Sequence, residues 1–345
     1  MSSHEQPPAN DQGIIDEIVK FGGNLQRQTT PALRGQHPKM HACLHGEFRV
    51  LDELPKNVAV GVFAEPRSFP VWIRYSNGFG TDDRQPDLHG MAIKLMGVPG
   101  DKLGQEKESQ DFVLMDTPCF FAGDVETLLR FIEQKVALMS QGKTEPEQFQ
   151  ALSVNFPNEV RRFLEMAGPT AAPPSNSRYW SCGASLLGDQ AVQYMIEPQG
   201  FDSEPSTALE IPDSENYGIK LLTESFITRA EDLVFNFHIQ KQIDPETEPV
   251  ENASVEWKGP YTRVAELTIP AQDFTDPDVV ELGDLLSFNP WHSLPEHRPL
   301  GGLNRSRKPA YEQSSQIRHE TLGAPMIEPR PGDTPKSVLK NIDRK

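Results

Sequence analysis

Short apolar runs divide the chain, and this division constrains its fold more than any other feature. The 345 residues include 31 prolines and 25 glycines, too many for an array of long helices. Between residues 40 and 118 the runs rich in β-branched and aromatic residues are EFRVL, VAVGVFA, FPVWIRYS, GMAIKLMGV and DFVLM. Because Pro, Gly and Asp separate these runs, they predict strands of an antiparallel sheet or barrel.

The periodicity changes in the middle of the chain and then returns. Between residues 121 and 170, DVETLLRFIEQKVALMSQG and PNEVRRFLEMAG carry apolar residues at helical spacing, with Asp124 as the expected N-cap of the first helix. Further strands are predicted for DQAVQYMIEPQG, DLVFNFHIQKQ, ASVEWKG and RVAELTIPAQ. Helices are therefore expected to interrupt a barrel that closes around a centre.

We find no internal repeat and no linker that would divide the chain, which predicts a single domain over residues 1–345. Residues 1–38 are expected to form an arm, residues 39–270 the barrel with its helical insertion, and residues 306–320 a helix. Residues 271–305 hold too much Pro and Gly for a regular element and predict a long crossover, and residues 321–345 predict a tail.

Charge and cysteine content limit the binding partners that the protein can have and the cellular compartment in which it is expected. Thirty-three basic and fifty acidic residues give a net charge of −17, which disfavours binding to nucleic acid or anionic membranes. The N-terminus lacks the features of a signal peptide, and no run approaches eighteen apolar residues. Three cysteines without CxxC spacing are most simply free thiols. These features predict a cytoplasmic protein.

The segment RKPAYEQSSQIR near the C-terminus is polar and cationic. If it is helical, Arg307, Tyr311, Ser314 and Arg318 occupy positions i, i+4, i+7 and i+11, which form one stripe of the helix. Such a stripe predicts a polar or anionic partner.

Histidines recur every fourth residue in HPKMHACLHGEF. On a helix, His37, His41 and His45 would share one face and could bind zinc or copper. Pro38 and Gly46 favour an extended segment instead, in which neighbouring histidines lie about 13 Å apart, too far to share a metal. Surface or core histidines are then the simpler interpretation.

Two further segments carry residues of interest, although neither defines a chemistry by itself. Arg74 and Ser76 lie two apart on a predicted strand and would point to the same side. Phe120 and Phe121 follow Thr-Pro and would ordinarily be core aromatics. The chain has no Gly-rich phosphate loop and no GxSxG motif, so nucleotide binding and serine hydrolysis lack support.

Taken in order, these segments resemble the catalase superfamily from about residue 37 to residue 320. The resemblance rests on MHACLHGEF, FPVWIRYSNGFG with PDLHGMAIKL, MDTPCFF, LSFNPWHSLPEHRPLGGLNR and RKPAYEQSSQIR. It implies an α+β fold: a catalase-like antiparallel eight-stranded β-barrel with helical insertions, an N-terminal arm and a long crossover. It also implies haem b as the cofactor.

On the proximal side of the haem, the resemblance makes Tyr311 the axial iron ligand, as a phenolate that Arg307 stabilises. Arg318 and Arg74 would bind haem carboxylates, and Ser314 completes the proximal pattern of the family.

On the distal side, the resemblance assigns proton transfer to His41, from the near oxygen of the hydroperoxide to the far one. Ser76 would fix the tautomer of His41, Phe120 would pack on the porphyrin, and Met40 would shape the distal pocket.

The sequence departs from the family at two distal positions. Met115 stands where catalases have an asparagine that helps to bind peroxide, and a thioether donates no hydrogen bond. The family has an arginine three residues before the distal histidine, and if His41 is that histidine, Pro38 stands in the arginine's place. Lys39 would then contact the haem carboxylate in place of the arginine. Because the chain ends soon after residue 320, no NADPH is expected.

These features together predict a haem-dependent hydroperoxidase, a catalase or peroxidase that acts on hydrogen peroxide or organic hydroperoxides through a ferryl intermediate in the response to oxidative stress. An organic molecule is expected as the electron donor, and a homo-oligomer is expected by analogy with the family. Two alternatives stay open: rearrangement of a fatty-acid hydroperoxide, as in catalase-related allene oxide synthases, and a non-enzymatic haem-binding protein.

Overall fold

Nine strands form one continuous antiparallel sheet. A computed structural model describes residues 4–29, 34–85, 87–167, 174–201, 213–340 and 342. Within these residues the strands are β1 Met40–Val50, β2 Ser68–Asn77, β3 His89–Met96, β4 Ser109–Met115, β5 Tyr179–Trp180, β6 Ser185–Leu187, β7 Gln190–Pro198, β8 Leu233–Lys241 and β9 Tyr261–Ile269.

The sheet closes on itself because β5 pairs with both β4 and β7. The closed circuit runs through β1, β2, β3, β4, β5, β7, β8 and β9, and β6 extends β7 as a hairpin. An eight-stranded antiparallel barrel was predicted from the sequence, and this fold is confirmed.

Large side chains fill the interior of the barrel. Phe48, Phe112 and Phe237 form its centre, and the ring centroids of Phe112 and Phe237 lie 4.8 Å apart. Phe63 and Tyr194 pack against these rings. A core packed in this way leaves little room for a ligand, so a binding site is expected on the outer face of the barrel or at its ends.

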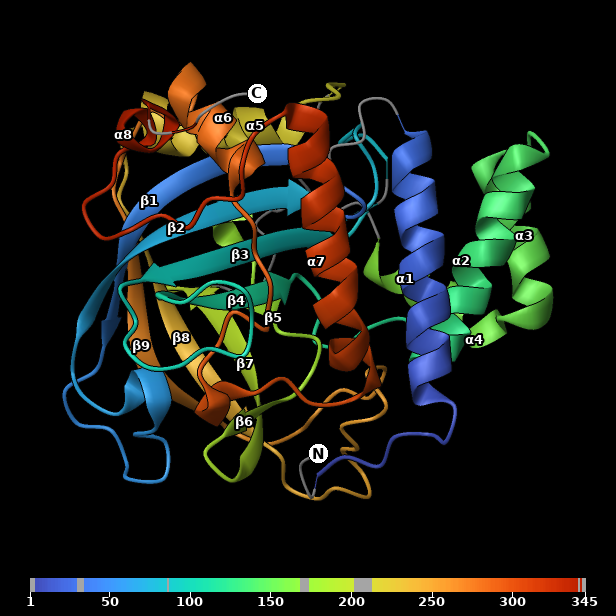
Figure 1. Ribbon diagram of the computed structural model, residues 1–345, viewed down its shortest axis with the longest axis horizontal. Coiled ribbons are helices and arrows are strands. Elements are labelled where there is room, and N and C mark those ends of the chain that lie inside the picture. The colour runs from blue at the N-terminus through green and yellow to red at the C-terminus, as the bar shows by residue number, and fades with distance from the viewer. Residues whose placement is uncertain are drawn as a thin grey trace.

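Helices cover one side and one end of the barrel. Figure 1 shows α7 beside the ends of β2 and β3, α1 next to α7, and α2–α4 beyond α1. Asp124 caps α2 by accepting a hydrogen bond from the backbone N–H of Thr127, as predicted. In the described part of the chain, no helix is both long enough and apolar enough to span a membrane. The helices are α1 Asp11–Gln28, α2 Val125–Ser140, α3 Glu145–Asn155, α4 Pro157–Met166, α5 Tyr217–Thr223, α6 Pro277–Leu285, α7 Gly302–Leu322 and α8 Pro335–Lys340.

Two of the predicted strands are wrong. The run VAVGVFA contains the 3₁₀ turn Gly61–Phe63, because Gly61 has a positive φ of 58° and a Cβ there would collide with the His297 ring. The run ASVEWKG does not pair with a strand, since the side chain of Gln240 binds the carbonyl oxygens of Trp257 and Gly259.

The crossover is more regular than the sequence suggested. Helix α6 forms within residues 271–305 because Asp276 caps the backbone N–H of Asp278 and Pro277 occupies the first turn, where proline is tolerated. Leu282 and Leu285 are buried, so α6 is held against the barrel by packing.

Candidate active site

A row of residues on the outer face of the barrel crosses four strands. Ser76 of β2 lies opposite Met40 of β1 and Gly90 of β3, and Gly90 lies opposite Met115 of β4. The neighbouring Tyr75 belongs to the barrel interior, and successive strand residues point to opposite faces, so Ser76 and its row point outward.

His37 sits over this row and contacts Ser76. Its Nδ1 lies 3.1 Å from the Ser76 hydroxyl, its backbone N–H donates to the carbonyl of Gly78 at 2.8 Å, and its carbonyl accepts from Arg74 at 3.0 Å. Gly90 makes room for the ring, since a Cβ there would lie 2.5 Å from His37 Cε1. Burial, reinforced by the charge of Arg74, lowers the pKa of His37 to about 3. The imidazole is therefore neutral at pH 7 and able to accept a proton.

The side chain of His41 contacts Asp83 and not Ser76. Its Nε2 is 3.2 Å from a carboxylate oxygen of Asp83, and the register of β1 against β2 shifts between Met40 and Ala42, on either side of His41. The predicted pairing of Ser76 with His41 is therefore wrong, because Ser76 contacts His37.

Asp83 organises the surroundings of His41. Its carboxylate accepts hydrogen bonds from Lys39 Nζ at 2.7 Å, from Asn77 Nδ2 at 2.8 Å and from the Gly218 backbone at 2.8 Å. Burial would raise the pKa of Asp83, but the bonds from His41 and Lys39 lower it below its ordinary range. Lys39, which was expected to contact a haem carboxylate, instead pairs with Asp83.

The three histidines of the HPKMHACLHGEF segment have separate partners. His37 contacts Ser76, His41 contacts Asp83, and His45 packs edge-on against Trp72 with ring centroids 6.2 Å apart. They do not form a common metal site.

Three arginines gather where the arm, β2 and α7 meet. Arg74 and Arg318 are each 3% exposed, and Arg34 donates to the carbonyls of Gly283 and Leu286. The Nε atoms of all three arginines are buried without a hydrogen-bond partner. Burial, together with repulsion from Arg34, lowers the pKa of Arg74 and that of Arg318. Asp284 is the carboxylate that partly offsets this, so the cluster is short of negative charge.

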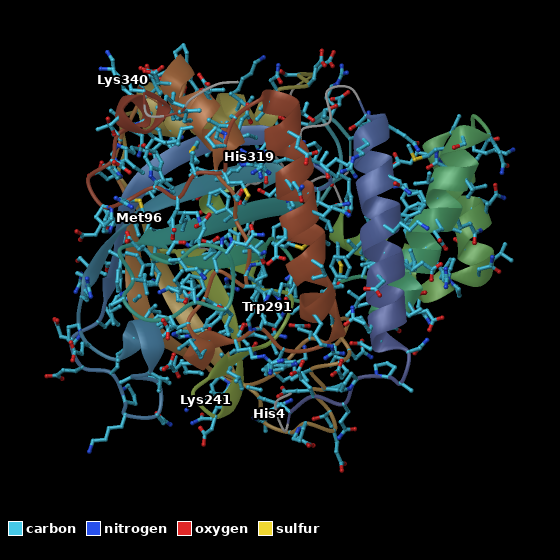
Figure 2. The ribbon with its side chains drawn as sticks, viewed as in Figure 1. His4, Met96, Lys241, Trp291, His319 and Lys340 are labelled. Carbon is cyan, nitrogen blue, oxygen red and sulfur yellow. The ribbon has the colours of Figure 1, made fainter. Side chains whose placement is uncertain are left out.

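Helix α7 carries Arg307 and Tyr311, two of the residues predicted from the sequence to lie on the proximal side. Arg307 is buried and donates to Asn304 Oδ1 at 3.1 Å, while Tyr311 is half-buried one turn further on. Among the described residues, the hydrogen bonds of Arg307 go to Asn304 and to the carbonyl of Ser181, and none goes to Tyr311. Figure 2 shows Trp291 beside the first turns of α7, where its indole donates to the Asn304 carbonyl.

The serines of α7 contact different parts of the molecule. Ser314 faces the arm, where its hydroxyl accepts from the Gly35 backbone and its carbonyl accepts from Gln26. Ser315 instead bonds Ser287 and lies 3.3 Å from an Arg318 nitrogen. Of these two serines, Ser315 is the one that contacts Arg318.

Apolar side chains complete the face between the row and α7. Met115 and Phe120 are buried in one cluster with Leu303 of α7, and Phe120 packs against Phe121 at 4.6 Å between ring centroids. This cluster supplies a flat apolar wall beside the polar pair of His37 and Ser76.

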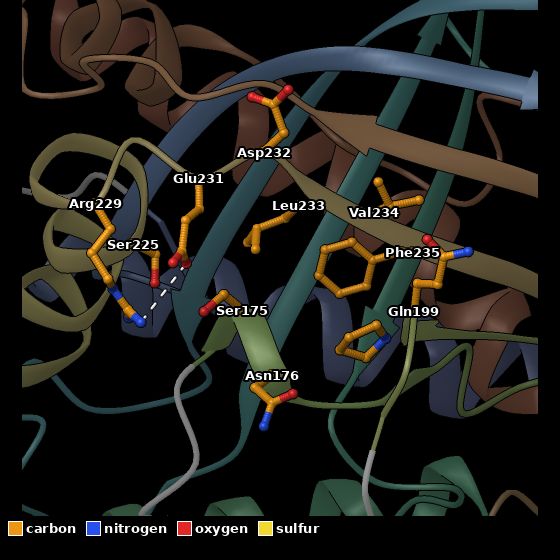
Figure 3. Close-up of a pocket in the computed structure, with 11 residues that line it drawn as sticks. Ser175, Asn176, Gln199, Ser225, Arg229, Glu231, Asp232, Leu233, Val234 and Phe235 are labelled. Atoms are coloured by element: carbon orange, nitrogen blue, oxygen red, sulfur yellow. Dashed lines mark ion pairs between the residues drawn. The ribbon is translucent and has the colours of Figure 1, made fainter.

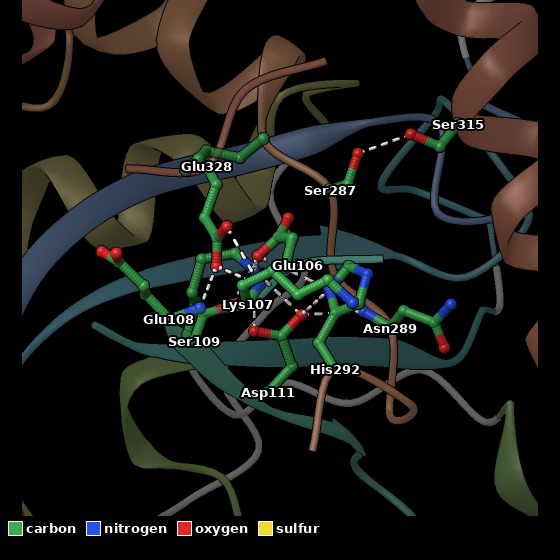
Figure 4. A network of polar contacts seen from close by, with 12 residues as sticks. Glu106, Lys107, Glu108, Ser109, Asp111, Ser287, Asn289, His292, Ser315 and Glu328 are labelled. Atoms are coloured by element: carbon green, nitrogen blue, oxygen red, sulfur yellow. Dashed lines mark hydrogen bonds and ion pairs between the residues drawn. The ribbon is translucent and has the colours of Figure 1, made fainter. Parts of the chain in front are cut away.

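A second buried polar network lies under the crossover. Glu106, Asp111 and His292 are close enough to hold a metal ion (Figure 4). The ammonium group of Lys94, however, bonds both carboxylates. The His292 ring bonds Asp111 at 2.9 Å. Lys94 supplies the positive charge, so this network is best understood as a buried ion-pair cluster.

A pocket of about 440 Å³ opens near the start of β8 (Figure 3). Phe235, Arg229 and Glu231 are among the residues that line it, and Arg229 and Glu231 form an ion pair with 3.7 Å between charged atoms. It contains none of the predicted site residues.

Searches of known proteins give matches at the level of structure only. No protein-family model matches the sequence, and no curated protein does. A bacterial catalase is similar with a TM-score of 0.67 and 15% identity, over 92% of this chain and 63% of that chain. Catalase A from Saccharomyces cerevisiae has a TM-score of 0.66 and 17% identity, over 93% of this chain and 69% of that chain. A fungal catalase has a TM-score of 0.63 and 18% identity, over 92% of this chain and 65% of that chain.

These matches establish that the protein has the catalase-like fold. The chain spans about two thirds of the length of the catalases it matches.

Sequence reasoning did not identify Arg34 as a candidate site residue, and it considered His37 only as a possible metal ligand together with His41 and His45. In the pattern of catalases an arginine lies three residues before a histidine, and Arg34 and His37 have this spacing, which is the signal that could have drawn attention to both. Asp83, the partner of His41, follows strand β2 in a segment without a recognisable motif.

Proposed function

We propose that the protein is a haem-dependent hydroperoxidase that cleaves the O–O bond of hydrogen peroxide or organic hydroperoxides. The observation that carries this proposal is the neutral His37 held by Ser76 on the outer face of the barrel, beside a buried arginine cluster that lacks negative charge. The catalase-like fold supports it.

The arginine cluster fits the two carboxylates of haem b. Arg34, Arg74 and Arg318 each keep a buried Nε without a partner, and an unpaired buried donor costs about 1–3 kcal/mol. Carboxylates would satisfy these donors and offset the repulsion between the guanidinium groups. Met115, Phe120 and Met40 would contact the apolar ring.

Tyr311 would hold the iron from α7, with Arg307 one turn away as the cation that stabilises its phenolate. Arg307 would exchange its bond to Asn304 for one to Tyr311. Haem bound here supplies the iron at which the O–O bond breaks.

We assign the proton transfer to His37 in place of His41. Ser76 fixes the orientation of the His37 ring through Nδ1, which leaves Nε2 to take the proton from the near oxygen of the hydroperoxide and return it to the far oxygen. With this assignment Arg34 fills the family's arginine position, and Pro38 is no longer a departure.

Met115 favours organic hydroperoxides as substrates. Its thioether cannot donate a hydrogen bond to a second molecule of hydrogen peroxide, whereas an apolar wall accommodates an alkyl group. The same feature keeps the rearrangement of a fatty-acid hydroperoxide as a second candidate, which consumes the substrate without an electron donor.

Turnover of an organic hydroperoxide by two matched histidine variants tests the proposal. Haem-loaded His37→Ala is expected to lose about 100-fold or more in kcat/KM while keeping its absorption spectrum, because a positioned acid–base group contributes this much. His41→Ala should retain turnover. Retained turnover in His37→Ala together with loss in His41→Ala would return the role to His41.

Loss in neither variant would contradict acid–base catalysis by this segment. Consumption of hydroperoxide without a donor would favour rearrangement.

A further inference from the structure

Two aromatic side chains extend the outer row from Met115 to the protein surface. Trp180 of β5 lies directly opposite Met115 of β4, and its indole Nε1 donates to the Tyr261 hydroxyl of β9 at 3.0 Å. Trp180 packs against the cluster that contains Met115 and Phe120, whereas Tyr261 is 41% exposed.

The row is short and continuous. Ser76, Gly90, Met115 and Trp180 occupy four successive strands. Three strand spacings of about 4.8 Å place the backbone of Trp180 roughly 14 Å from that of Ser76. The indole therefore borders the apolar wall of the proposed haem site, and Tyr261 connects it to solvent.

A hydroperoxidase with Met115 in this position needs an external reductant. Reduction of a hydroperoxide to an alcohol and water takes two electrons and two protons, and two molecules of a one-electron donor must return them. Indole and phenol rings are the protein side chains that most readily lose one electron, and here one of each is joined by a hydrogen bond.

We infer that Trp180 and Tyr261 form an electron-entry site for small phenolic donors, an inference that rests on the proposed function. In each return step Trp180 gives one electron to the oxidised cofactor and recovers one from Tyr261. Tyr261 then takes an electron and a proton from a phenol in contact with its exposed ring, replacing the phenolic proton that it released to solvent. Two such steps oxidise two phenols to phenoxyl radicals and release two protons to solvent. These protons balance the two that are taken up from solvent as one hydroperoxide becomes an alcohol and water.

The hydrogen bond suits this role for Tyr261. Its oxygen accepts from Trp180, so its own O–H remains available to lose a proton outward. The neighbouring His238 ring lies 6.2 Å from the Tyr261 ring in an edge-on arrangement and keeps the phenol oriented.

Spin trapping in the haem-loaded protein tests this inference with a readout other than turnover. The protein would receive one equivalent of an organic hydroperoxide and a nitroso spin trap, and adducts would be mapped by peptide mass spectrometry. We expect adducts on Trp180 and Tyr261, and their loss at Tyr261 in Trp180→Phe. Oxidation of a methoxyphenol should fall by about tenfold in Trp180→Phe and severalfold in Tyr261→Phe.

The first reaction with hydroperoxide should be unchanged in both variants, because neither residue belongs to the proton-transfer pair. Trp257→Phe and Tyr194→Phe are the matched controls, since Trp257 lies in a separate buried cluster and Tyr194 lies inside the barrel. Tyr261→Phe removes a single exposed hydroxyl and keeps the test valid if Trp180→Phe folds poorly.

If the wild type reacts with hydroperoxide, two results would overturn the electron-entry site and leave the proposed function standing. One is adducts absent from both aromatic residues, and the other is methoxyphenol oxidation as fast in Trp180→Phe and Tyr261→Phe as in the controls. A wild-type protein that does not react with hydroperoxide would overturn the proposed function as well.

Discussion

At the scale of single residues, a register shift decides which histidine meets the outer row. Met40 pairs with Ser76 and Ala42 with Tyr75, so His41 has no partner in the ladder and its side chain reaches Asp83. His37 precedes the strand, with a positive φ of 54°, and folds back over Ser76. His37 and His41 are only four residues apart, but the first contacts Ser76 and the second contacts Asp83.

Introducing at position 115 the asparagine that catalases have there is expected to change the balance between the two proposed activities, oxygen release and donor oxidation. Met115→Asn in the haem-loaded protein should raise oxygen release from hydrogen peroxide severalfold relative to donor oxidation, because the amide adds a hydrogen-bond donor where the thioether has none. Oxygen evolution and donor oxidation would be measured on the same sample. An unchanged ratio would show that Met115 does not limit peroxide binding, and Met115→Leu is the control for altered packing.

Buried neutral histidines are expected to make the folded protein less stable at acidic pH. Burial lowers the pKa of His37 and of His297 to about 3 and that of His319 to about 4. In the unfolded chain histidine has a pKa of about 6.5. The unfolded state therefore binds more protons in this interval, and the free energy of unfolding falls as the pH decreases from about 6.5 to 4.

Each such histidine contributes about 1.4 kcal/mol per pH unit to this slope. His297 isolates the effect, since His297→Gln can still accept the hydrogen bond from the Val62 backbone. Urea unfolding at pH 7, 6 and 5 should give a slope that is smaller in the variant by about this amount. An identical slope in the wild type and the variant would mean that His297 is not held neutral.

At the scale of elements, α1 and the residues before it hold α7 in position. Arg305 of α7 bonds Asp11 at 2.7 Å, Glu5 at 2.8 Å and Glu251 at 2.9 Å, with its side chain only 12% exposed. Further along, Gly23 of α1 packs so closely on Gln313 of α7 that a Cβ would collide with it. The arm that the sequence predicted is thus a support for the proposed proximal helix.

Loss of Arg305 should release this support. Arg305→Gln leaves three carboxylates facing one another in a partly buried site, and we expect the free energy of unfolding to fall by about 3–5 kcal/mol. Arg161→Gln is the control, because its pair with Glu165 is more than half exposed and should be worth less than about 1 kcal/mol. Equal losses in chemical denaturation would contradict the role of Arg305.

At the scale of the whole molecule, the fold was predictable and the site only in part. The barrel follows from runs such as LVFNFHIQ, whose alternation buries Phe235, Phe237 and Ile239. The site depends on single residues, and the turn at His37 and the shift at Met40 leave no periodic signal.

Local structure that depends on side chains was also missed. Asp276 and Pro277 begin a helix inside a crossover that composition alone described as irregular, and Gly61 turns an apolar run away from strand geometry. In both places one or two residues outweigh the average character of the segment.

Haem titration of the apoprotein, followed by absorption, tests the central claim most directly. The wild type should bind one haem per chain with a Soret band, and Tyr311→Phe should lose or shift that band. Tyr194→Phe, which alters a tyrosine inside the barrel, should match the wild type. A wild-type protein without a Soret band, or a Tyr311→Phe spectrum identical to that of the wild type, would contradict the proposal that α7 and the arginine cluster hold a haem.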